Sequence, residues 1–486
     1  MKTKISFDYT PRTKPLNHQV EAIDFVSSHD IVPLFDEQGL GKSKVVIDAL
    51  CRNLKTGAIE GALIICKKSL LYMWKREVEK HSNLFPVVID GTKKTRGRSL
   101  LRLGHFYIGN YETVVENYDL IELLLKSRKM ALVLDESQTI KNPEAKVTRT
   151  ILGLRNLVEK RIIITGTPIA NKPDDIWSQF FFLDGGRLLG VGYPAFKKQF
   201  KLNLKGVQDL SQFEANLTAL REKIASISIR RTKDVLELPD KTFTQITMKL
   251  AKEQREIYDL AREEMLCEIT NVSGETIQEE IENYLVKLLR LTQIASNPRL
   301  LDDAYSETPA KFLALDELLS KVIEKGEKAI VWTSFVDNVR ALKHRYSGYG
   351  ARTLFGEMPI VEREIVMAKF LKDNLCKVLV ANPSAAKEGL TLTSANNAIY
   401  LDRNFKMDDY LQSQDRIHRI GQTRPCEIVK LIAEDTIDEY TDEILEKKET
   451  ISKYTLGDTK NLKPNRSYLS KEDLLIILGG KSHERD

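Results

Sequence analysis

The chain has 486 residues, which is too long for a single hydrophobic core and suggests two to four domains. Charged residues make up 29% of it and apolar residues 42%, as in ordinary globular proteins. The net charge of +5 is the small difference between 74 basic and 69 acidic residues, so a polyanionic partner would need a local basic track. No stretch approaches 18 consecutive apolar residues, which argues against a membrane-spanning protein and a membrane partner.

The five cysteines are scattered, and none forms a Cys-x-x-Cys pair. This usage indicates a reducing compartment without a disulfide framework or structural zinc. The first 15 residues lack the apolar core of a secretory signal. We therefore expect a cytoplasmic protein of a bacterial or phage-infected cell, or a nuclear protein if the source is eukaryotic.

Short apolar runs alternate with longer helical patterns in the first third of the chain and again after residue 310. The runs that we expect to be strands are 31–35, 62–66, 131–135, 161–165, 329–333, 378–382, 398–402 and 427–432. Strands separated by helices predict parallel sheets built from βαβ units. The stretch 186–310 has a mostly helical pattern. The predicted fold is therefore α/β, with two parallel-sheet lobes at 1–185 and 311–450, a helical insertion at 186–310 and a tail at 451–486.

The stretch Asp36-Glu-Gln-Gly-Leu-Gly-Lys-Ser43 lies between a predicted strand and a predicted helix. This is the context of a phosphate-binding loop, in which backbone N–H groups and the helix dipole attract anions. Lys42 would reach the β- and γ-phosphates, and Ser43 would hold Mg²⁺. Asp36 stands where the first glycine of the full motif belongs. The loop residues predicted to bind the nucleotide are Asp36, Glu37, Gln38, Gly39, Leu40, Gly41, Lys42 and Ser43.

Three further groups of polar residues accompany predicted strands. Asp135 and Glu136 end a buried strand as paired carboxylates. Asp135 would support the Mg²⁺ shell, and Glu136 would orient or activate the attacking water. Thr165 and Thr167 suit a hydrogen-bonded relay that senses the nucleotide, although a strand followed by a Gly-Pro turn explains them equally well. Gln19, on a predicted helix before the first strand, would read an adenine edge with its amide. A solvated helix residue is the alternative.

The segment Gln414-Asp-Arg-Ile-His-Arg-Ile-Gly-Gln422 carries two arginines three residues apart. If this segment is helical, Arg416 and Arg419 share a face. Two guanidiniums on one face suit phosphate recognition, and one of them would act as an arginine finger on the γ-phosphate. A solvated basic helix end is the alternative.

Taken together, these motifs resemble the Swi/Snf-type ATPases of helicase superfamily two, from Leu16 to about Ile432. The stretches that carry the resemblance are His18-Gln19, the loop at 36–43, LIICKKSLLYMWKREVEK at 63–80, DESQTIKN at 135–142, TGTPIAN at 165–171, RRTKDV at 230–235, LRLTQIASNPRL at 289–300, VWTSF at 331–335, EGLTLTSANNAIYLD at 388–402 and QDRIHRIGQ at 414–422. The EGLTLTSA form and the serine after Asp-Glu resemble the annealing-helicase branch most. The departures are Gln138 in place of the usual His, Ala386-Lys387 in place of Gly-Gly, and Thr391 in place of Asn.

The resemblance implies a duplex-DNA-stimulated ATPase that translocates along DNA, with ATP and Mg²⁺ between two RecA-like lobes and a tail that braces the motor. The implied catalytic residues are Lys42, Asp135, Glu136, Arg416 and Arg419, with Ser43 and Asp135 on the metal. The residues that would couple hydrolysis to DNA are Gln138, Thr165, Thr167 and Gly389. The expected contacts to phosphates of duplex or forked DNA are Lys68, Ser69, Ser334, Arg230 and Arg231. For the two arginines at 230–231, a solvated basic face is the alternative.

Three function classes remain open. The first is a duplex-DNA translocase that remodels forks, anneals strands or strips bound proteins. The second is a strand-separating DNA or RNA helicase, which the RRTK and NPRL segments disfavour because simple RNA helicases lack them. The third is a nucleotide-gated DNA-binding module with weak ATPase activity, to which the Gln138 departure points. A monomer is expected, and the sequence leaves a partner nuclease or another partner protein open.

Overall fold

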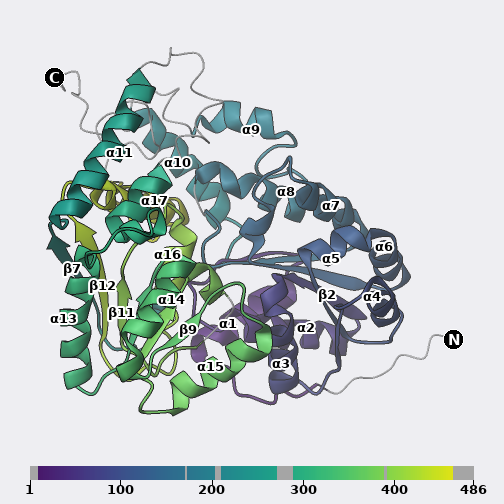
Figure 1. The fold of residues 1–486 in the computed structure, drawn as a ribbon. Helices are drawn as coiled ribbons and strands as arrows, with labels where there is room; N and C mark the ends of the chain where they lie inside the picture. Colours follow the sequence, from purple (N-terminus) through teal and green to yellow (C-terminus); the bar gives the residue numbers. More distant parts are fainter. Residues whose placement is uncertain (1–8, 170–171, 203–209, 271–287, 388–390, 463–486) are drawn as a thin grey trace. The chain divides into compact units, whose positions relative to one another are not determined.

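The computed structural model describes residues 9–169, 172–202, 210–270, 288–387 and 391–462. The chain divides into two compact units. Unit 1 comprises residues 1–237 and 449–464, and unit 2 comprises 238–448 and 465–486. Each unit contains one six-stranded sheet in which all neighbouring strands are parallel (Figure 1). This architecture confirms the predicted α/β class with two RecA-like parallel-sheet lobes.

The sheet of unit 1 has the strand order β1-β6-β5-β2-β4-β3. Its strands are β1 (Ile31–Leu34), β2 (Gly61–Cys66), β3 (Pro86–Val88), β4 (Phe106–Asn110), β5 (Met130–Asp135) and β6 (Lys160–Ile164). Successive side chains enter two different cores: Ile64 and Val133 pack into one, and Ile65 and Leu134 into the other. Burial on both faces explains why the strands read as continuous apolar runs.

Helices cover both faces of this sheet, as Figure 1 shows. One face is covered by α1 (Asn17–Ser28), α2 (Lys42–Thr56) and α3 (Leu71–His81). The other face is covered by α5 (Tyr111–Glu116), α6 (Tyr118–Ser127), α7 (Lys146–Leu154) and α8 (Trp177–Asp184). Unit 1 also contains α4 (Lys93–Leu100), α9 (Tyr193–Phe200) and α10 (Leu210–Ala225).

A segment from the far end of the sequence completes unit 1. Helix α17 (Ile437–Leu456) begins in unit 2 and ends in unit 1. In unit 1, the Tyr454 hydroxyl lies 2.7 Å from Oγ1 of Thr218 on α10, and the Arg221 guanidinium lies over the Tyr454 ring at 4.9 Å. Ser452 donates a hydrogen bond of 3.3 Å to the Ile169 carbonyl just after β6. The predicted tail therefore begins as part of the first unit's core, while residues 463–486 lie outside the described residues.

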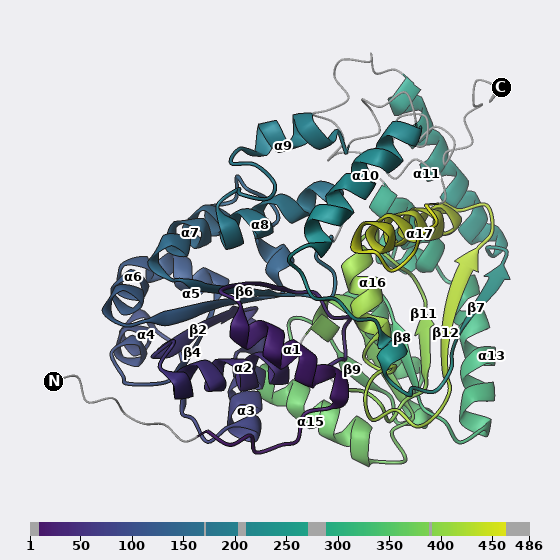
Figure 2. The ribbon, with the colours of Figure 1, turned by 180° about the vertical axis from the view of Figure 1, so that it is seen from behind.

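The sheet of unit 2 has the strand order β7-β12-β11-β8-β10-β9. Its strands are β7 (Lys241–Met248), β8 (Ala329–Trp332), β9 (Arg352–Leu354), β10 (Val378–Ala381), β11 (Asn397–Tyr400) and β12 (Cys426–Ala433). The helices of the unit include α11 (Lys252–Thr270), α13 (Ala310–Glu324), α14 (Val336–Arg345), α15 (Ile360–Lys372) and α16 (Met407–Gln414). Figure 2 shows β7, in teal, beside the yellow β12, although they are far apart in the sequence.

Strand β7 lies within the stretch 186–310, which the sequence predicts to be mostly helical, and most of the described elements there are helices. The division between the units falls at 237/238, so α9 and α10 belong to unit 1 and β7 and α11 belong to unit 2. Strand β7 is an edge strand with no buried residue in its run, and its Phe243 side chain is 58% exposed. An exposed edge strand lacks the apolar run by which strands such as β5 and β8 were predicted. In the part of the chain that the structure describes, no helix is long and apolar enough to cross a membrane.

Candidate nucleotide-binding site

The predicted phosphate loop connects β1 to α2 in unit 1. Gly39 and Gly41 have φ angles of 90° and 80°, in the left-handed region that glycine adopts without strain. A Cβ added to Gly41 would lie 2.4 Å from Nε2 of Gln19, so a larger residue would also collide with α1. Lys42 is the first residue of the 15-residue helix α2. The strand, glycine turn and helix that the sequence predicted are therefore present, with the helix N-terminus following the loop.

The Lys42 ammonium lies against the inside of this loop. Its Nζ donates hydrogen bonds to the carbonyls of Asp36 at 2.7 Å and Glu37 at 3.2 Å. Burial lowers the pKa of Lys42, and the negative charges of Glu136, Asp36 and Asp135 act in the opposite direction. The ammonium is thus held where the carboxylates at the end of β5 influence it. This is the arrangement expected of a lysine that binds phosphate oxygens.

The paired carboxylates lie at the end of β5. Glu136 has a φ of 50°, which is uncommon for a residue other than glycine. Burial, followed by the nearby charge of Glu136, raises the pKa of Asp135 to about 6, whereas Trp74 and Lys42 lower it. The amide Nε2 of Gln138 donates a 2.6 Å hydrogen bond to Oε2 of Glu136. Gln138 therefore contacts the residue that is predicted to orient the water.

The loop after β6 approaches the same place. A Cβ added to Gly166 would lie 2.6 Å from Cγ of Gln38 and 3.4 Å from Nζ of Lys42. Thr167 donates its backbone N–H to Oγ1 of Thr165 at 3.0 Å. Because β1, β6 and β5 are neighbours in the sheet, their carboxyl ends bring the three loops together.

A buried side-chain bridge joins two of these loops. Ser137, in the turn η2 (Ser137–Ile140), donates to Oε1 of Gln179 at 2.7 Å. Gln179 in turn donates to the Pro168 carbonyl at 2.7 Å. Both Ser137 and Gln179 are fully buried. The bridge fixes the loop after β5 relative to the loop after β6.

Three buried polar atoms around this point have no hydrogen-bond partner among the described residues. They are Nε2 of Gln38, Oε1 of Gln138 and Oγ1 of Thr167. Buried polar atoms in folded proteins are almost always paired with protein or water. One donor, one acceptor and one hydroxyl beside Lys42 match the oxygens of a polyphosphate and the water molecules of a hydrated Mg²⁺. The residues present therefore fit ATP and Mg²⁺.

Gln19 is attached to the phosphate loop from α1. Its Nε2 donates to the Leu40 carbonyl at 3.1 Å, and its Oε1 accepts from the backbone N–H of Leu16 at 3.0 Å. A ring nitrogen of His18 lies 3.0 Å from the same Leu40 carbonyl. Gln19 thus holds the loop in this structure, and its predicted contact with adenine stays a prediction.

Arg230 and Arg231, predicted to contact DNA, are engaged inside unit 1. Arg231 makes a two-point contact with Asp36, with Nε–Oδ1 3.0 Å and Nη2–Oδ2 2.6 Å. Arg230 makes a similar contact with Asp458, at 2.6 and 2.5 Å, and also donates to the Phe35 carbonyl at 2.5 Å. The Arg231 side chain is only 11% exposed, and the Arg230 side chain 14%. Their guanidiniums hold the phosphate loop and the segment around Asp458, and their predicted contact with DNA stays a prediction.

The other predicted DNA contacts lie in loops. Lys68 and Ser69 form the start of the turn η1 (Lys68–Leu70), where Lys68 is exposed and Ser69 is partly exposed. In unit 2, Ser334 follows β8, and its backbone N–H donates to Oδ1 of Asp402 at 2.6 Å. Ser334 also accepts a 2.8 Å hydrogen bond from Asn382 through its carbonyl. Their contact with DNA stays a prediction.

The arginine motif of unit 2 is not helical as hypothesised. Helix α16 ends at Gln414, and residues 415–420 form turns and bends. In this segment the backbone N–H of Arg416 donates a hydrogen bond to the Ser413 carbonyl. Arg416 is 6% exposed, and its Nε donates to the Gln412 carbonyl at 3.0 Å. The argument that Arg416 and Arg419 share a helical face therefore does not hold, although their role as arginine fingers stays a prediction. Gly389 lies outside the described residues.

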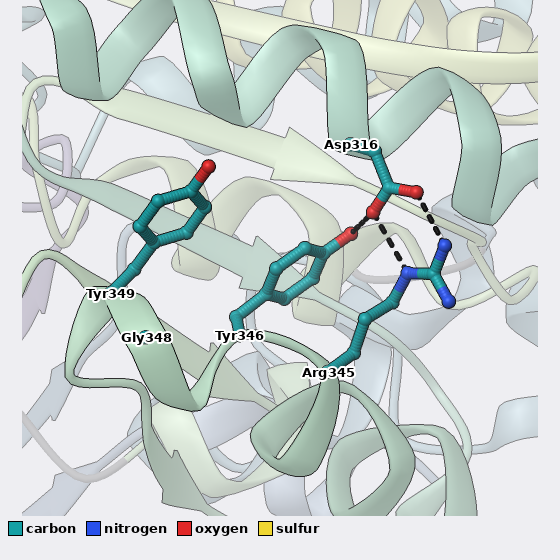
Figure 3. A pocket seen from close by; sticks show the side chains of 5 residues that line it. All are labelled: Asp316, Arg345, Tyr346, Gly348 and Tyr349. Carbon is teal, nitrogen blue, oxygen red and sulfur yellow. Dashed lines mark hydrogen bonds and ion pairs between the residues drawn. The ribbon is translucent and has the colours of Figure 1, made fainter.

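A cavity of about 220 Å³ lies in another part of unit 2. Figure 3 shows the side chains that line it. Its lining residues are Asp316, Arg345, Tyr346, Gly348 and Tyr349. The Asp316 carboxylate accepts hydrogen bonds from Nε of Arg345 at 2.8 Å and from the Tyr346 hydroxyl at 2.9 Å. The charged groups that line this cavity already pair with one another. We therefore interpret Asp316 and Arg345 as a structural ion pair that joins α13 to α14.

The family of the chain follows from two matches to family profiles. A profile described as SNF2-related domain matches residues 18–300, more than half of the chain. The chain belongs to the SNF2-related family. A second profile, described as helicase conserved C-terminal domain, matches residues 310–421. These matches confirm the resemblance to Swi/Snf-type proteins of the helicase superfamily.

Several known proteins are similar to this SNF2-related chain. It is 29% identical to an uncharacterized ATP-dependent helicase of Mycoplasma pneumoniae, over 97% of this chain and 45% of that protein. It is 29% identical to the putative ATP-dependent helicase/translocase YwqA of Bacillus subtilis, over 86% of this chain and 46% of that protein. It is 27% identical to the mouse SWI/SNF-related matrix-associated actin-dependent regulator of chromatin subfamily A member 1, over 93% of this chain and 44% of that protein. The chain thus spans less than half the length of these curated relatives.

A solved structure covers nearly the same length. The Sulfolobus solfataricus SWI2/SNF2 ATPase core in complex with dsDNA is 27% identical in sequence, with 97% of this chain and 98% of that chain covered and a TM-score of 0.44.

Proposed function

We propose that the chain is an ATP-dependent DNA translocase, which hydrolyses ATP to move along duplex DNA. The observation that carries the proposal is the convergence of three loops in unit 1. They bring Lys42, Asp135 and Glu136 together with three unpaired buried polar atoms. Membership of the SNF2-related family supports the same reading.

Each residue of the site has a proposed role. The loop N–H groups and Lys42 bind the β- and γ-phosphates, and Ser43 and Asp135 hold Mg²⁺. Bound Mg²⁺ supplies charge neutralisation of the phosphate oxygens. Glu136 orients the attacking water and accepts its proton, and Gln138 fixes the Glu136 carboxylate through the 2.6 Å hydrogen bond.

The DNA is duplex or forked DNA, contacted through its phosphates by Lys68, Ser69 and Ser334. Contacts to phosphates carry no sequence information, so we expect little sequence preference and steep salt dependence. The finer proposals are that the protein remodels forks or protein–DNA complexes, acts as a monomer in the cytoplasm, and stands near the annealing-helicase branch. The EGLTLTSA form supports the last of these.

Steady-state ATP hydrolysis at low salt tests the proposal. We expect strong stimulation by duplex or forked DNA, and loss of turnover in Lys42→Ala and Glu136→Gln proteins. Single-stranded DNA and RNA serve as the comparison substrates. Stimulation by RNA or single strands alone, without any by duplex DNA, would contradict the translocase assignment.

Two alternatives are tested alongside it. A strand-separating helicase would displace the strand of a plain tailed duplex in an ATP-dependent manner. A nucleotide-gated binding module would bind DNA tightly with no stimulation of turnover, and Glu136→Gln would then leave turnover unchanged. Gln138 stands where the family usually has His, and it contacts Glu136. This departure is the reason for testing the second alternative.

The arginine fingers have their own test. If Arg419 stabilises the developing phosphate charge, Arg419→Ala lowers turnover by roughly 10³-fold or more. The same measurement on Arg416→Ala shows which of the two acts. Near-normal turnover in both variants would remove the arginine fingers from the mechanism.

A further inference from the structure

Trp74 is a fully buried aromatic residue of α3 with a polar contact that the sequence did not indicate. It lies in the core that packs α1, α2 and α3 on the sheet of unit 1. From there its indole Nε1–H donates a hydrogen bond of 2.7 Å to Oδ2 of Asp135. A buried tryptophan usually finds a partner for its N–H. The partner here is the carboxylate proposed to hold Mg²⁺.

The contact is one of three that fix Asp135. Its Oδ1 accepts the backbone N–H of Glu136 at 3.0 Å, and its main-chain carbonyl accepts the Tyr111 hydroxyl at 2.8 Å. Tyr111, on α5, is 2% exposed, and Trp74 is 0% exposed. Each carboxylate oxygen therefore has one donor, and the donor on Oδ2 is held by core packing. A carboxylate held in this way has little freedom to rotate.

A second tryptophan of unit 1 provides the contrast. Trp177, at the start of α8, is also buried, but its Nε1–H donates to the Gly190 main-chain carbonyl at 3.2 Å. A carbonyl is the ordinary partner for a structural indole. Groups that hydrogen-bond to metal-binding carboxylates, in contrast, set the orientation of the ligand, and losing one typically costs 10- to 100-fold in metal affinity.

We propose that Trp74 is a positioning residue, whose indole N–H holds Asp135 in the orientation that receives the Mg²⁺ of the nucleotide complex. The inference rests on the proposed function, because it requires a Mg²⁺–nucleotide site at Asp135. The Trp74 side chain is fully buried, and its indole N–H is bonded to Asp135. It acts through Asp135, and its effect appears in the Mg²⁺ requirement of nucleotide binding.

The test compares Trp74→Phe with Trp177→Phe in the full chain. Both changes keep an aromatic ring in the core and remove one indole N–H. Calorimetric titration with ADP over a range of Mg²⁺ concentrations gives the Mg²⁺ midpoint of binding without any turnover. We expect Trp74→Phe to raise this midpoint about tenfold or more and Trp177→Phe to leave it unchanged. Thermal unfolding of both variants shows whether each is folded.

Tryptophan emission gives a second readout. When Mg²⁺ and ADP are added together, emission should change in the wild type and in Trp177→Phe, both of which retain Trp74. The change should be absent from Trp74→Phe. If Trp74→Phe does not fold, an unchanged emission in Trp177→Phe on addition of Mg²⁺ and ADP overturns the inference by itself.

The outcomes separate this inference from the proposed function. If folded Trp74→Phe has the same Mg²⁺ midpoint of ADP binding as the wild type, the role of Trp74 is refuted and the proposed nucleotide site stands. Absence of any Mg²⁺-dependent ADP binding in the wild type refutes the proposed function, and the inference with it.

Discussion

Arg231 and Asp36 are 195 residues apart in the sequence, yet the guanidinium and the carboxylate meet in a two-point contact of 3.0 and 2.6 Å. Asp36 is 1% exposed and begins the phosphate loop. The backbones of the two segments are also hydrogen-bonded, since the Glu37 N–H donates to the Arg231 carbonyl at 2.8 Å. The RRTKDV segment therefore helps to shape the predicted phosphate loop.

This pair predicts a large loss of stability when one partner is removed. Arg231→Ala leaves the Asp36 charge buried without its cation, so we expect unit 1 to lose about 3 kcal/mol of its free energy of unfolding and ADP to bind more weakly. Arg52→Ala breaks the exposed pair of Arg52 with Asp24, at 44% and 62% exposure, and should cost less than about 1 kcal/mol. Denaturant unfolding measures both. Equal losses in the two variants would mean that the buried pair has no special role.

Gln138 predicts an effect on turnover rather than on nucleotide binding. Its 2.6 Å hydrogen bond to Glu136 orients a carboxylate that sits at an uncommon backbone angle. We expect Gln138→Ala to lower kcat roughly tenfold with little change in KM for ATP, since a lost hydrogen bond to a charged group costs about 1.5 kcal/mol or more. Gln212→Ala, which removes an exposed glutamine of α10, serves as the control. A change confined to KM would contradict a role in orienting Glu136.

Two glycines of unit 2 predict different losses for the same substitution. Gly350 and Gly326 have φ angles of 64° and 76°, so an alanine at either position costs about 1–2 kcal/mol in backbone strain. A Cβ on Gly350 would also lie 2.3 Å from the Leu375 carbonyl oxygen, whereas a Cβ on Gly326 meets nothing within 4 Å. Gly350→Ala should therefore destabilise the unit by about 1–3 kcal/mol more than Gly326→Ala. Unfolding curves of the two variants would show the difference, and coincident curves would rule out the clash.

Asp442 predicts a stability difference that depends on pH. Burial raises the pKa of this carboxyl, but the cations of Arg403 and Lys430 outweigh it and hold the pKa below its ordinary value. A folded-state pKa below the unfolded value stabilises the fold above the unfolded pKa of about 3.9, and this stabilisation disappears as the pH falls through the folded-state value. We expect Asp442→Asn to cost about 2 kcal/mol at pH 7 and progressively less below pH 4. A difference that stays constant between pH 7 and pH 3 would contradict this account.

The eight strands that the sequence predicted are largely buried, as β2 and β5 are. The strands that it missed are short, as β3 and β9 are, lie exposed at an edge, as β7 does, or, like β4, end in Gly and Asn after only three apolar residues. A strand of three residues has too few positions to show a period, and an exposed edge strand has no continuous apolar run. Local pattern therefore predicted the strands with continuous apolar runs better than the short, exposed or mixed ones.

The sequence by itself located the predicted nucleotide site of this protein. A glycine-rich turn before Lys42 and paired carboxylates after an apolar strand predict a nucleotide site from local residues alone, because each motif is continuous in the chain. Only the tertiary structure decided which distant side chains support that site. Arg231 meets Asp36 and Trp74 meets Asp135 across 195 and 61 residues. Sequence spacing carries no record of such pairs, since the strand order and the packing of α3 place them together.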